Sequence, residues 1–243
     1  MPATKQCTEL SFVIPVLNEA RGLRALLGYL RQRFPAAQII VVDGGSHDAS
    51  VAEAIAEGVV VLTAERGRAA QMNVGAAAAE GEFLCFLHAD TKPDFDHSGL
   101  DKWLSTSFDW GFCRVALRSD RRSLRIVSAC INLRSRWTGV ATGDQMFVVR
   151  RSLFERLGGF AAIPLMEDVE LSKRLRREMA PQPLPLRVCT SARRWEQGGV
   201  ASTVVRMWCL RLAFWLGVSP QRLWAHYYGA SLDERAEPLV DHH

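Results

Sequence analysis

The sequence predicts a single α/β domain built on a Rossmann-like, mostly parallel sheet that is flanked by helices. Short apolar runs rich in β-branched or aromatic residues alternate with helical patterns as far as Asp90. Such alternation requires right-handed crossovers and covers both faces of a parallel sheet. With 243 residues, of which 48% are hydrophobic, the chain is long enough to bury one such core.

The first half is expected to contribute the parallel strands. They are predicted at Leu10 to Val16, Ile39 to Val42, Val59 to Leu62 and Phe83 to Leu87. The helices between them are predicted at about Ala20 to Phe34, Asp48 to Glu57 and Ala69 to Glu80. In sheets of this kind ligands bind at the carboxyl ends of the strands.

After Asp90 the pattern becomes mixed. Strands are expected at Phe112 to Leu117, Gln145 to Val149 and Leu186 to Thr190. A helix is expected from near Asp168 to before Pro181, and an apolar helix from Val200 to Leu216. An arginine-rich segment runs from Arg118 to Trp137. We find no internal repeat and no linker long enough to separate two domains.

Composition narrows the functional classes. The net charge is only +4, and 26 of the 30 basic residues are arginine, which weakly favours anionic ligands over nucleic acid. The six cysteines include no CxxC pair, which fits a reducing, cytoplasmic compartment. The start of the chain is polar, and no apolar run reaches the roughly 18 residues of a spanning helix. We therefore expect a soluble or membrane-peripheral protein.

Polar residues follow each predicted strand of the first half. These segments are Leu17-Asn18-Glu19, Asp43 to Asp48, Glu65 to Arg68 and His88-Ala89-Asp90. The first turn has no GxGxxG pattern, which disfavours a dinucleotide-binding dehydrogenase. The carboxyl edge of the sheet is thus the expected binding site.

The second and third turns carry residues with two interpretations each. Asp43 could accept hydrogen bonds from a base or ribose hydroxyl, or could simply form the turn, while Ser46 and Asp48 are typical helix caps. Arg66 and Arg68 stand at the amino end of a helix, where the helix dipole disfavours cations. An anion such as a diphosphate would offset them, although solvated arginines are an equal alternative.

His88 and Asp90 end an apolar strand two residues apart. Imidazole and carboxylate are both competent metal ligands, and packing does not explain an aspartate at a strand end. The H-x-D pattern alone is weak, and its position in the fold strengthens it.

Glu167 and Asp168 stand at the start of a helix that carries basic residues toward its end. That order satisfies the helix dipole, so a structural role is as plausible as a catalytic one. The functional interpretation takes Asp168 as a general base that activates an acceptor hydroxyl.

Taken in order, these segments resemble the family 2 glycosyltransferases of GT-A fold over nearly the whole chain. Ser11 to Glu19 resembles the opening strand and its P-x-x-N-E turn, and Val41 to Asp48 the D-x-x-S-x-D segment. Gly67 to Gly75 matches the G-x-x-x-x-x-N-x-G helix, and Met166 to Asp168 the E-D motif. Arg193-Arg194-Trp195 resembles the R-W of processive members, without the usual preceding Q-x-x.

The resemblance implies an inverting transfer from a nucleotide-diphosphate sugar to an acceptor hydroxyl, with Mn²⁺ or Mg²⁺ as cofactor. It implies a nucleotide-binding half at 8–92, an acceptor half at 93–198, and a C-terminal helix and tail at 199–243. Asp168 would be the catalytic base, with Glu167 beside it. Asp90 would hold the metal, with His88 as a second candidate ligand. The nucleotide-sugar side would include Pro15, Asn18, Glu19, Asp43, Gly44, Arg68, Asn73, His88 and Ala89.

The metal motif departs from the family pattern, because His88-Ala89-Asp90 stands where D-x-D is usual. Asp90 keeps the second carboxylate, which is the usual direct ligand. The H-A-D motif, the G-R-A-x-Q-M-N helix and the small size resemble a compact bacterial branch of the family, some members of which are associated with arsenosugar biosynthesis. That resemblance assigns no substrate here.

Two other classes stay open. A nucleotidyltransferase can share this topology, but it would need a glycine-rich basic loop after the first strand, which Val16 to Glu19 does not supply. A catalytically inactive relative that binds a partner or a lipid surface is compatible with His88. The helix at 200–217 carries tryptophan and arginine, so it is expected to pack on the protein itself or a second subunit, or to touch a membrane surface.

Overall fold

The computed structural model describes residues 9–105 and 107–229. Its main sheet has six strands in the order β3-β2-β1-β4-β8-β6. The parallel strands are β1 (Leu10–Val16), β2 (Gln38–Asp43), β3 (Val60–Thr63) and β4 (Phe83–Phe86). β8 (Phe147–Arg150) runs antiparallel to β4 and to β6 (Trp110–Phe112). The predicted α/β class and mostly parallel sheet are confirmed.

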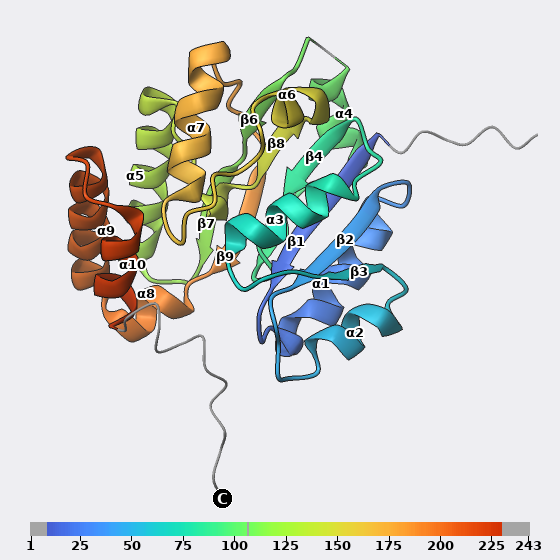
Figure 1. The fold of residues 1–243 in the computed structure, drawn as a ribbon, viewed down its shortest axis with the longest axis horizontal. Helices are drawn as coiled ribbons and strands as arrows, with labels where there is room; N and C mark the ends of the chain where they lie inside the picture. The colour runs from blue at the N-terminus through green and yellow to red at the C-terminus, as the bar shows by residue number, and fades with distance from the viewer. Residues whose placement is uncertain (1–8, 106, 230–243) are drawn as a thin grey trace, which may run out of the picture.

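Helices cover both faces of this sheet. α1 (Ala20–Arg33) buries Leu23, Leu27 and Leu30 against one face, and α2 (Ser50–Ala56) packs beside it. α4 (His97–Leu104) joins the same core through Leu100. The other face is covered by α3 (Arg68–Ala77), α6 (Arg151–Arg156) and α7 (Glu167–Glu178). In Figure 1, α3 lies across the near face of the sheet.

A second, small, three-stranded sheet lies beside the main sheet. Its order is β5 (Thr91–Pro93), β9 (Arg187–Ser191) and β7 (Arg114–Arg118). The strand predicted over Phe112 to Leu117 is confirmed for Arg114 to Leu117 in β7. It was wrong as one continuous strand, because the chain leaves the main sheet after β6 and enters the small sheet at β7. Cys113, between them, hydrogen-bonds to the backbone of Gln145 in the 3-10 turn Gly143–Gln145.

The arginine-rich segment forms a long helix, α5 (Arg122–Thr138), to which the sequence analysis assigned no structure. Its inner face is partly polar. The Asn132 side chain accepts from the N–H of Val115 and donates to its carbonyl, both at 2.9 Å, and Ser128 accepts from the N–H of Leu117. These side chains satisfy the outer edge of β7 in place of another strand.

The C-terminal part is helical. α8 (Arg193–Gly198) leads into α9 (Val200–Trp215), and α10 (Pro220–Tyr228) packs back against α9. Figure 1 shows α9 and α10 at the left edge. Leu210 and Leu223 pack against Met166 and Val169 near the start of α7. No helix within 9–105 and 107–229 is long and apolar enough to span a bilayer.

The order of the strands places the binding edge. The chain builds β1, β2 and β3 outward in one direction, then returns through α3 to put β4 on the other side of β1. β1 continues into α1 on one face of the sheet, whereas α3, which precedes β4, covers the other face. The strand order reverses between β1 and β4, and this switch point leaves a crevice at the edge of the sheet.

α3 lies unusually close to the sheet at Gly75. A Cβ there would stand 2.4 Å from Cγ1 of Val13 and 2.9 Å from Cγ2 of Val42. Gly28, in α1, is a matched helical glycine whose Cβ would meet only a carboxylate oxygen of Glu57, at 3.9 Å.

We therefore expect opposite effects from the same substitution at the two positions. Gly75→Ala should lower the free energy of unfolding, because overpacking costs about 1–3 kcal/mol, against a gain of about 1 kcal/mol for alanine over glycine in a helix. Gly28→Ala should raise the unfolding free energy by up to about 1 kcal/mol. Urea unfolding monitored by circular dichroism measures both, and a stabilised Gly75→Ala protein would show that α3 does not need this contact.

Candidate active site

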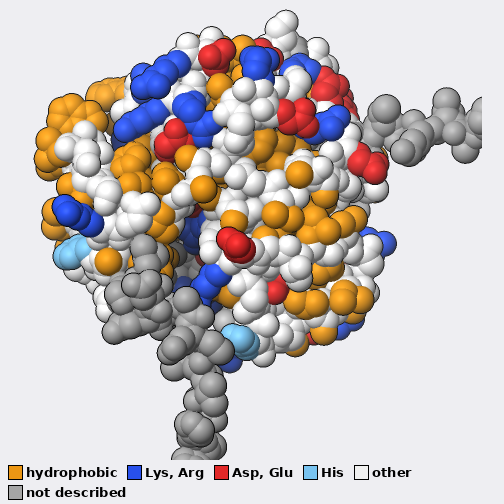
Figure 2. Space-filling model, in the orientation of Figure 1, with side chains coloured by type: hydrophobic (Ala, Val, Ile, Leu, Met, Phe, Trp, Pro, Cys, Tyr) orange, Lys and Arg blue, Asp and Glu red, His pale blue; other side chains and the backbone are white. Residues whose placement is uncertain are grey.

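A cavity of about 900 Å³ opens at the switch point. Figure 2 shows this face of the molecule hollowed near its centre, with basic side chains in the hollow. Its walls come from the ends of β1 and β4, the start of α3, the loop before α7, and the C-terminal helices. Of the sequence-predicted site residues, the cavity is lined by Pro15, Glu19, Arg68, His88, Ala89, Asp90 and Glu167.

Gln71 closes the floor of the cavity. Its buried side-chain amide donates to the carbonyl oxygens of Val16 at 2.8 Å and Val42 at 2.7 Å, at the ends of neighbouring strands. Gly44 is required beside it, because a Cβ at residue 44 would stand 2.9 Å from the Gln71 amide carbon. Gly44 thus acts through close packing.

The turn residues Asn18 and Asp43 hold the adjacent loops together and do not line the cavity. The Oδ2 of Asp43 accepts from the backbone N–H groups of Gly45 and Ser46, and its Oδ1 accepts from that of Ser46. Asn18, at φ 55°, accepts from the N–H of His47. The turn-forming interpretation of Asp43 accounts for these contacts.

Asp48 and Asn73 also connect loops. Asp48 accepts from the backbone of Ala20, where α1 begins, and from Ser50 at the start of α2. The Asn73 amide exchanges two hydrogen bonds of 2.9 Å with the backbone of Phe160, fixing α3 to the loop that precedes α7. Neither side chain lines the cavity.

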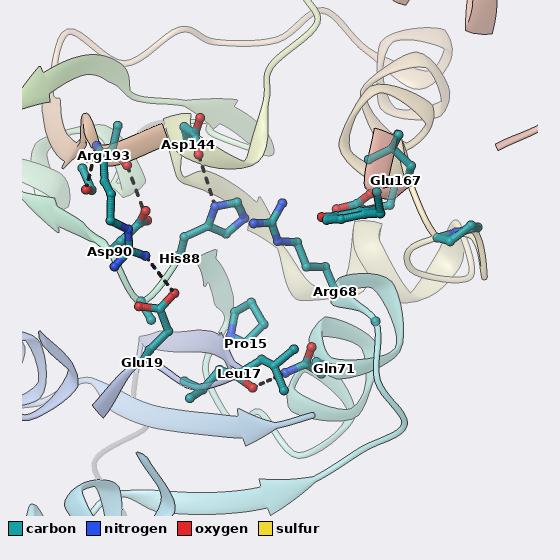
Figure 3. Close-up of a pocket in the computed structure, with 18 of the residues that line it drawn as sticks. Pro15, Leu17, Glu19, Arg68, Gln71, His88, Asp90, Asp144, Glu167 and Arg193 are labelled. Carbon is teal, nitrogen blue, oxygen red and sulfur yellow. Dashed lines mark hydrogen bonds and ion pairs between the residues drawn. The ribbon is translucent and has the colours of Figure 1, made fainter. Parts of the chain in front are cut away.

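Glu19 and Asp90 face the cavity from the ends of β1 and β4 (Figure 3). Desolvation, followed by the charge of Asp90, raises the pKa of Glu19. Arg193 partly opposes this effect, with a nitrogen 3.9 Å from the Glu19 carboxylate. The charge of Asp90 disfavours the ionisation of Glu19, and two neighbouring carboxyl groups make this end of the cavity attractive to a cation.

The small sheet orients Asp90. Its Oδ1 accepts from the hydroxyl of Thr91 at 3.2 Å, and Thr91 is itself paired with Thr190 of β9. Its main-chain carbonyl accepts from the Arg118 guanidinium. These contacts hold the strand end while leaving the carboxylate in the cavity wall.

His88 points toward Asp144, which the sequence analysis did not select. The His88 Nδ1 lies 3.3 Å from a carboxylate oxygen of Asp144. The imidazole also packs on Gly143, where a Cβ would stand 2.4 Å from Nε2. The ring is therefore confined between this turn and the strand end.

Arg68 enters the same space from the first turn of α3 and points between His88 and Glu167 in Figure 3. Desolvation lowers the pKa of its guanidinium, but the charges of Glu167 and Asp144 outweigh this and raise the pKa overall. Arg66 lines the cavity beside it. This wall thus presents positive charge to the cavity, as the anion hypothesis requires.

Glu167 and Asp168 begin α7, directly after Met166 in the left-handed conformation at φ 70°. Such backbone costs about 1–3 kcal/mol for a non-glycine residue and is typical of functional sites. The Asp168 Oδ2 accepts from the N–H of Gly143 at 2.9 Å, and its Oδ1 from the N–H of Val169 at 2.7 Å. Asp168 is therefore fixed to the turn that carries Asp144.

Burial perturbs both carboxyl groups. Desolvation, followed by the charge of Asp168, raises the pKa of Glu167 to about 7. Desolvation also raises the pKa of Asp168, against the hydrogen bonds from Gly143 and Val169. A carboxyl group whose pKa lies near neutrality is suited to proton transfer.

A divalent ion would find only part of its ligand set in the protein. Among the residues described, no group of three or more histidine, cysteine or acidic side chains is arranged to hold a metal. Asp90 and Glu19, whose pKa is raised, nonetheless fit a cation that is also coordinated by bound phosphates, as Mg²⁺ commonly is. His88 fits less well in this conformation, since its nitrogens face Asp144 and Gly143.

Sequence reasoning missed several cavity residues. Gln71 lies in the quoted helix motif, but only the fold shows that its amide caps two strand ends. Asp144 lies in a short polar turn with no recognisable pattern. Tyr228 and Trp224 come from α10, which was not predicted.

Comparisons with known proteins agree with this geometry. The sequence model described as Glycosyl transferase family 2 matches residues 11–99. No curated protein sequence matches the chain.

Several solved structures share the fold. The mannosyltransferase PcManGT from Pyrobaculum calidifontis, in complex with GDP-Man and Mn²⁺, is 19% identical with a TM-score of 0.56, over 74% of this chain and 56% of that one. S. aureus TarS with UDP is 16% identical at TM-score 0.55, over 75% and 60%. Glucosyl-3-phosphoglycerate synthase from Mycobacterium tuberculosis, with Mn²⁺ and UDP-glucose, is 17% identical at TM-score 0.53, over 75% and 69%.

The match thus covers 56% and 60% of the first two of these chains. At these identities the likeness concerns the fold alone. The chain has the fold of the GT-A glycosyltransferases, and its residues 11–99 carry the sequence pattern of glycosyl transferase family 2.

Proposed function

We propose that the chain is an inverting glycosyltransferase that moves a sugar from a nucleotide-diphosphate sugar to an acceptor hydroxyl. The observation that carries this proposal is that acidic side chains lie at two ends of one connected space. Asp90 lines it at the switch point, and Glu167 and Asp168 line it at the start of α7. One end suits a cation and its phosphates, and the other suits proton removal. The family 2 pattern over residues 11–99 and the GT-A fold support the same conclusion.

The donor side is proposed to hold the diphosphate between Asp90 and the arginines at the start of α3. Arg68 offers its guanidinium to the cavity, and no described residue hydrogen-bonds to it or pairs with it within 4.0 Å. Mn²⁺ or Mg²⁺ bound at Asp90 would neutralise the departing nucleoside diphosphate. Asp43 and Asn18, which shape the β1 and β2 turns, would act on the nucleoside through those loops.

The acceptor side is proposed to use Asp168 as general base. Asp168 takes the proton from the acceptor hydroxyl as that oxygen forms a bond to the anomeric carbon. The bond from the anomeric carbon to the diphosphate breaks, and its electron pair leaves with the nucleoside diphosphate. A single displacement of this kind inverts the anomeric centre. The Gly143 N–H keeps the carboxylate oriented.

The finer identity stays a prediction. The compact bacterial branch, the division at 92 and 198, and a cytoplasmic location rest on the sequence alone. A catalytically inactive relative would keep the Asp90 region but would not need a carboxyl pair of raised pKa, and a nucleotidyltransferase would need a glycine-rich basic loop after β1. The raised pKa values of Glu167 and Asp168 therefore favour the enzyme.

Asp90→Ala is expected to abolish metal-dependent nucleotide binding, because it removes the carboxylate proposed to bind the ion. Calorimetry with UDP and GDP, in Mn²⁺ and in chelator, measures this. Asp94→Ala is the matched control, since Asp94 follows β5 and pairs with Arg187 outside the cavity. Unchanged affinity in Asp90→Ala would exclude Asp90 as the metal residue, and His88→Ala would then test the second candidate.

Asp168→Asn is expected to lower turnover by about 10²- to 10⁴-fold, the usual contribution of a general base. Donor affinity should stay nearly unchanged, because asparagine can still accept from Gly143. Glu167→Gln should have a smaller effect. Single-turnover assays measure the rate, and proton NMR of the product measures its anomeric configuration. Wild-type turnover in Asp168→Asn, or a retained configuration, would mean that the base lies elsewhere.

The rate should also fall at acidic pH, with the acidic limb above the ordinary carboxyl range, because burial raises the pKa of Asp168. The base works only when ionised, and burial raises the pKa of Asp168 while that of Glu167 lies at about 7. Glu167→Gln removes a neighbouring negative charge, so it should move the acidic limb to lower pH. A profile of turnover against pH tests this. An acidic limb in the wild type near 4, the ordinary carboxyl range, would contradict it.

A further inference from the structure

A second cavity of about 430 Å³ lies between α5 and α9 and meets the first at Arg68, His88, Asp144 and Glu167. Asp168 lines this second cavity and is absent from the described lining of the first. A molecule bound there would therefore reach the proposed base directly. The volume falls within the range of small-molecule sites.

The walls of this cavity are mostly apolar. α5 contributes Ile126 and Ile131, and α9 contributes Met207 and Trp208. Ile126 is 64% exposed and Trp208 is 71% exposed, so the apolar wall continues onto the outer surface. In Figure 2, apolar side chains gather at the left edge, over α9. Such walls favour an acceptor with a long apolar part over a fully polar one.

Two arginines interrupt the apolar wall. Arg134 of α5 and Arg211 of α9 both line the cavity, and the buried Nε of each has no hydrogen-bond partner within the described parts of the chain. The terminal nitrogen of Arg134 donates to Ser135. Desolvation lowers the pKa of Arg134, and the charge of Asp168 only partly opposes it. A buried guanidinium nitrogen without an acceptor is costly, and phosphate is a ligand with which guanidinium groups pair well.

We propose that this cavity binds the acceptor and that the acceptor is an anionic lipid: an apolar chain between α5 and α9, a phosphate at Arg134 and Arg211, and a free head-group hydroxyl at Asp168. The inference rests on the proposed function. The hydroxyl proton passes to Asp168, the oxygen bonds to the anomeric carbon, and the nucleoside diphosphate leaves with the electron pair of the broken bond. The lipid would enter from a membrane surface along the exposed part of α9.

A second copy of the chain is the main competing occupant of this face. It would cover Trp208 and the exposed end of Ile126, but would leave the inward Nε atoms of Arg134 and Arg211 without an acceptor. The lipid satisfies both the apolar and the charged parts of the wall. The second cavity also reaches Asp168, the proposed base, and an interface between two helices would not need such a carboxylate.

The test uses lauroyl lysophosphatidylglycerol below its critical micelle concentration, titrated into the full chain by calorimetry. Monolaurin supplies the chain and hydroxyls without phosphate, and glycerol 1-phosphate supplies the head without the chain. We expect the whole lipid to bind about tenfold or more tightly than either part, since each part loses one of the two interactions. Equal binding of the lipid and monolaurin would overturn the role of the arginines.

Variants locate the binding. Arg134→Gln should weaken the lipid by about 10- to 100-fold and leave monolaurin unchanged. Arg125→Gln, on an exposed position of the same helix, is its control. Ile126→Asn should weaken both the lipid and monolaurin. Leu133→Asn, at a 51% exposed position that does not line the cavity, should weaken neither. Arg211→Gln, in α9, should likewise weaken lipid binding and leave monolaurin binding unchanged.

Nucleotide binding in Mn²⁺ is measured on every variant and keeps the two proposals separate. Retained UDP or GDP binding shows that a variant is folded, and loss of lipid binding then concerns this cavity alone. If the wild type binds nucleotide and no lipid, the lipid acceptor is wrong and the glycosyltransferase proposal stands. If neither nucleotide binds, the proposed function fails. A concentration-dependent dimer that Ile126→Asn breaks, in sedimentation velocity, would assign this face to a second copy.

Discussion

The site depends on the reversal of strand order between β1 and β4. Because the chain returns through α3 to the other side of β1, the two strand ends open toward each other at the edge of the sheet. Gln71 seals the floor by donating to the carbonyls of Val16 and Val42, near the ends of β1 and β2. Asp90 and Arg68 then face one cavity, although they come from different elements.

Charge arrangement divides that cavity into two chemical regions. At the strand ends, the charge of Asp90 and burial raise the pKa of Glu19, and the two carboxyl groups together favour a cation. Across the cavity, Glu167 lines the wall and Asp168 follows it in the lining of the adjoining cavity, and burial raises the pKa of both. Arg68, between Glu167 and His88, carries positive charge. A group-transfer enzyme needs this separation, because the leaving group gains negative charge while the nucleophile loses a proton. The turn at Gly143 and Asp144 connects the two regions by contacting both His88 and Asp168.

Local sequence predicted the first half of the fold well. The apolar strands and the Leu23-to-Leu30 stripe of α1 indicate burial directly, so the four parallel strands and three helices were placed to within about three residues. α5 was missed because its inner face uses Ser128 and Asn132, which hydrogen-bond to β7, in place of an apolar stripe. The division at Cys113 was missed because one apolar run serves two sheets.

The site residues also divide into those that the local sequence predicts and those that depend on the fold. His88, Asp90 and Arg68 were predictable because strand ends and helix starts are visible in sequence, and the structure brings them to one cavity. Asn18, Asp43 and Asn73 matched family motifs, yet here their side chains hold loops together. Gln71 and Asp144 depend on contacts between distant segments, which no local pattern records.

The central claim is that the cavity at the switch point binds a nucleotide-diphosphate sugar, and thermal stability of the wild-type chain tests it most directly. Unfolding is followed with UDP-sugars and GDP-sugars, each with and without Mn²⁺. A donor at about 100 times its dissociation constant should add about 2.7 kcal/mol of stability, and only when the ion is present. A folded chain whose stability no nucleotide sugar raises, with or without the ion, would contradict the account.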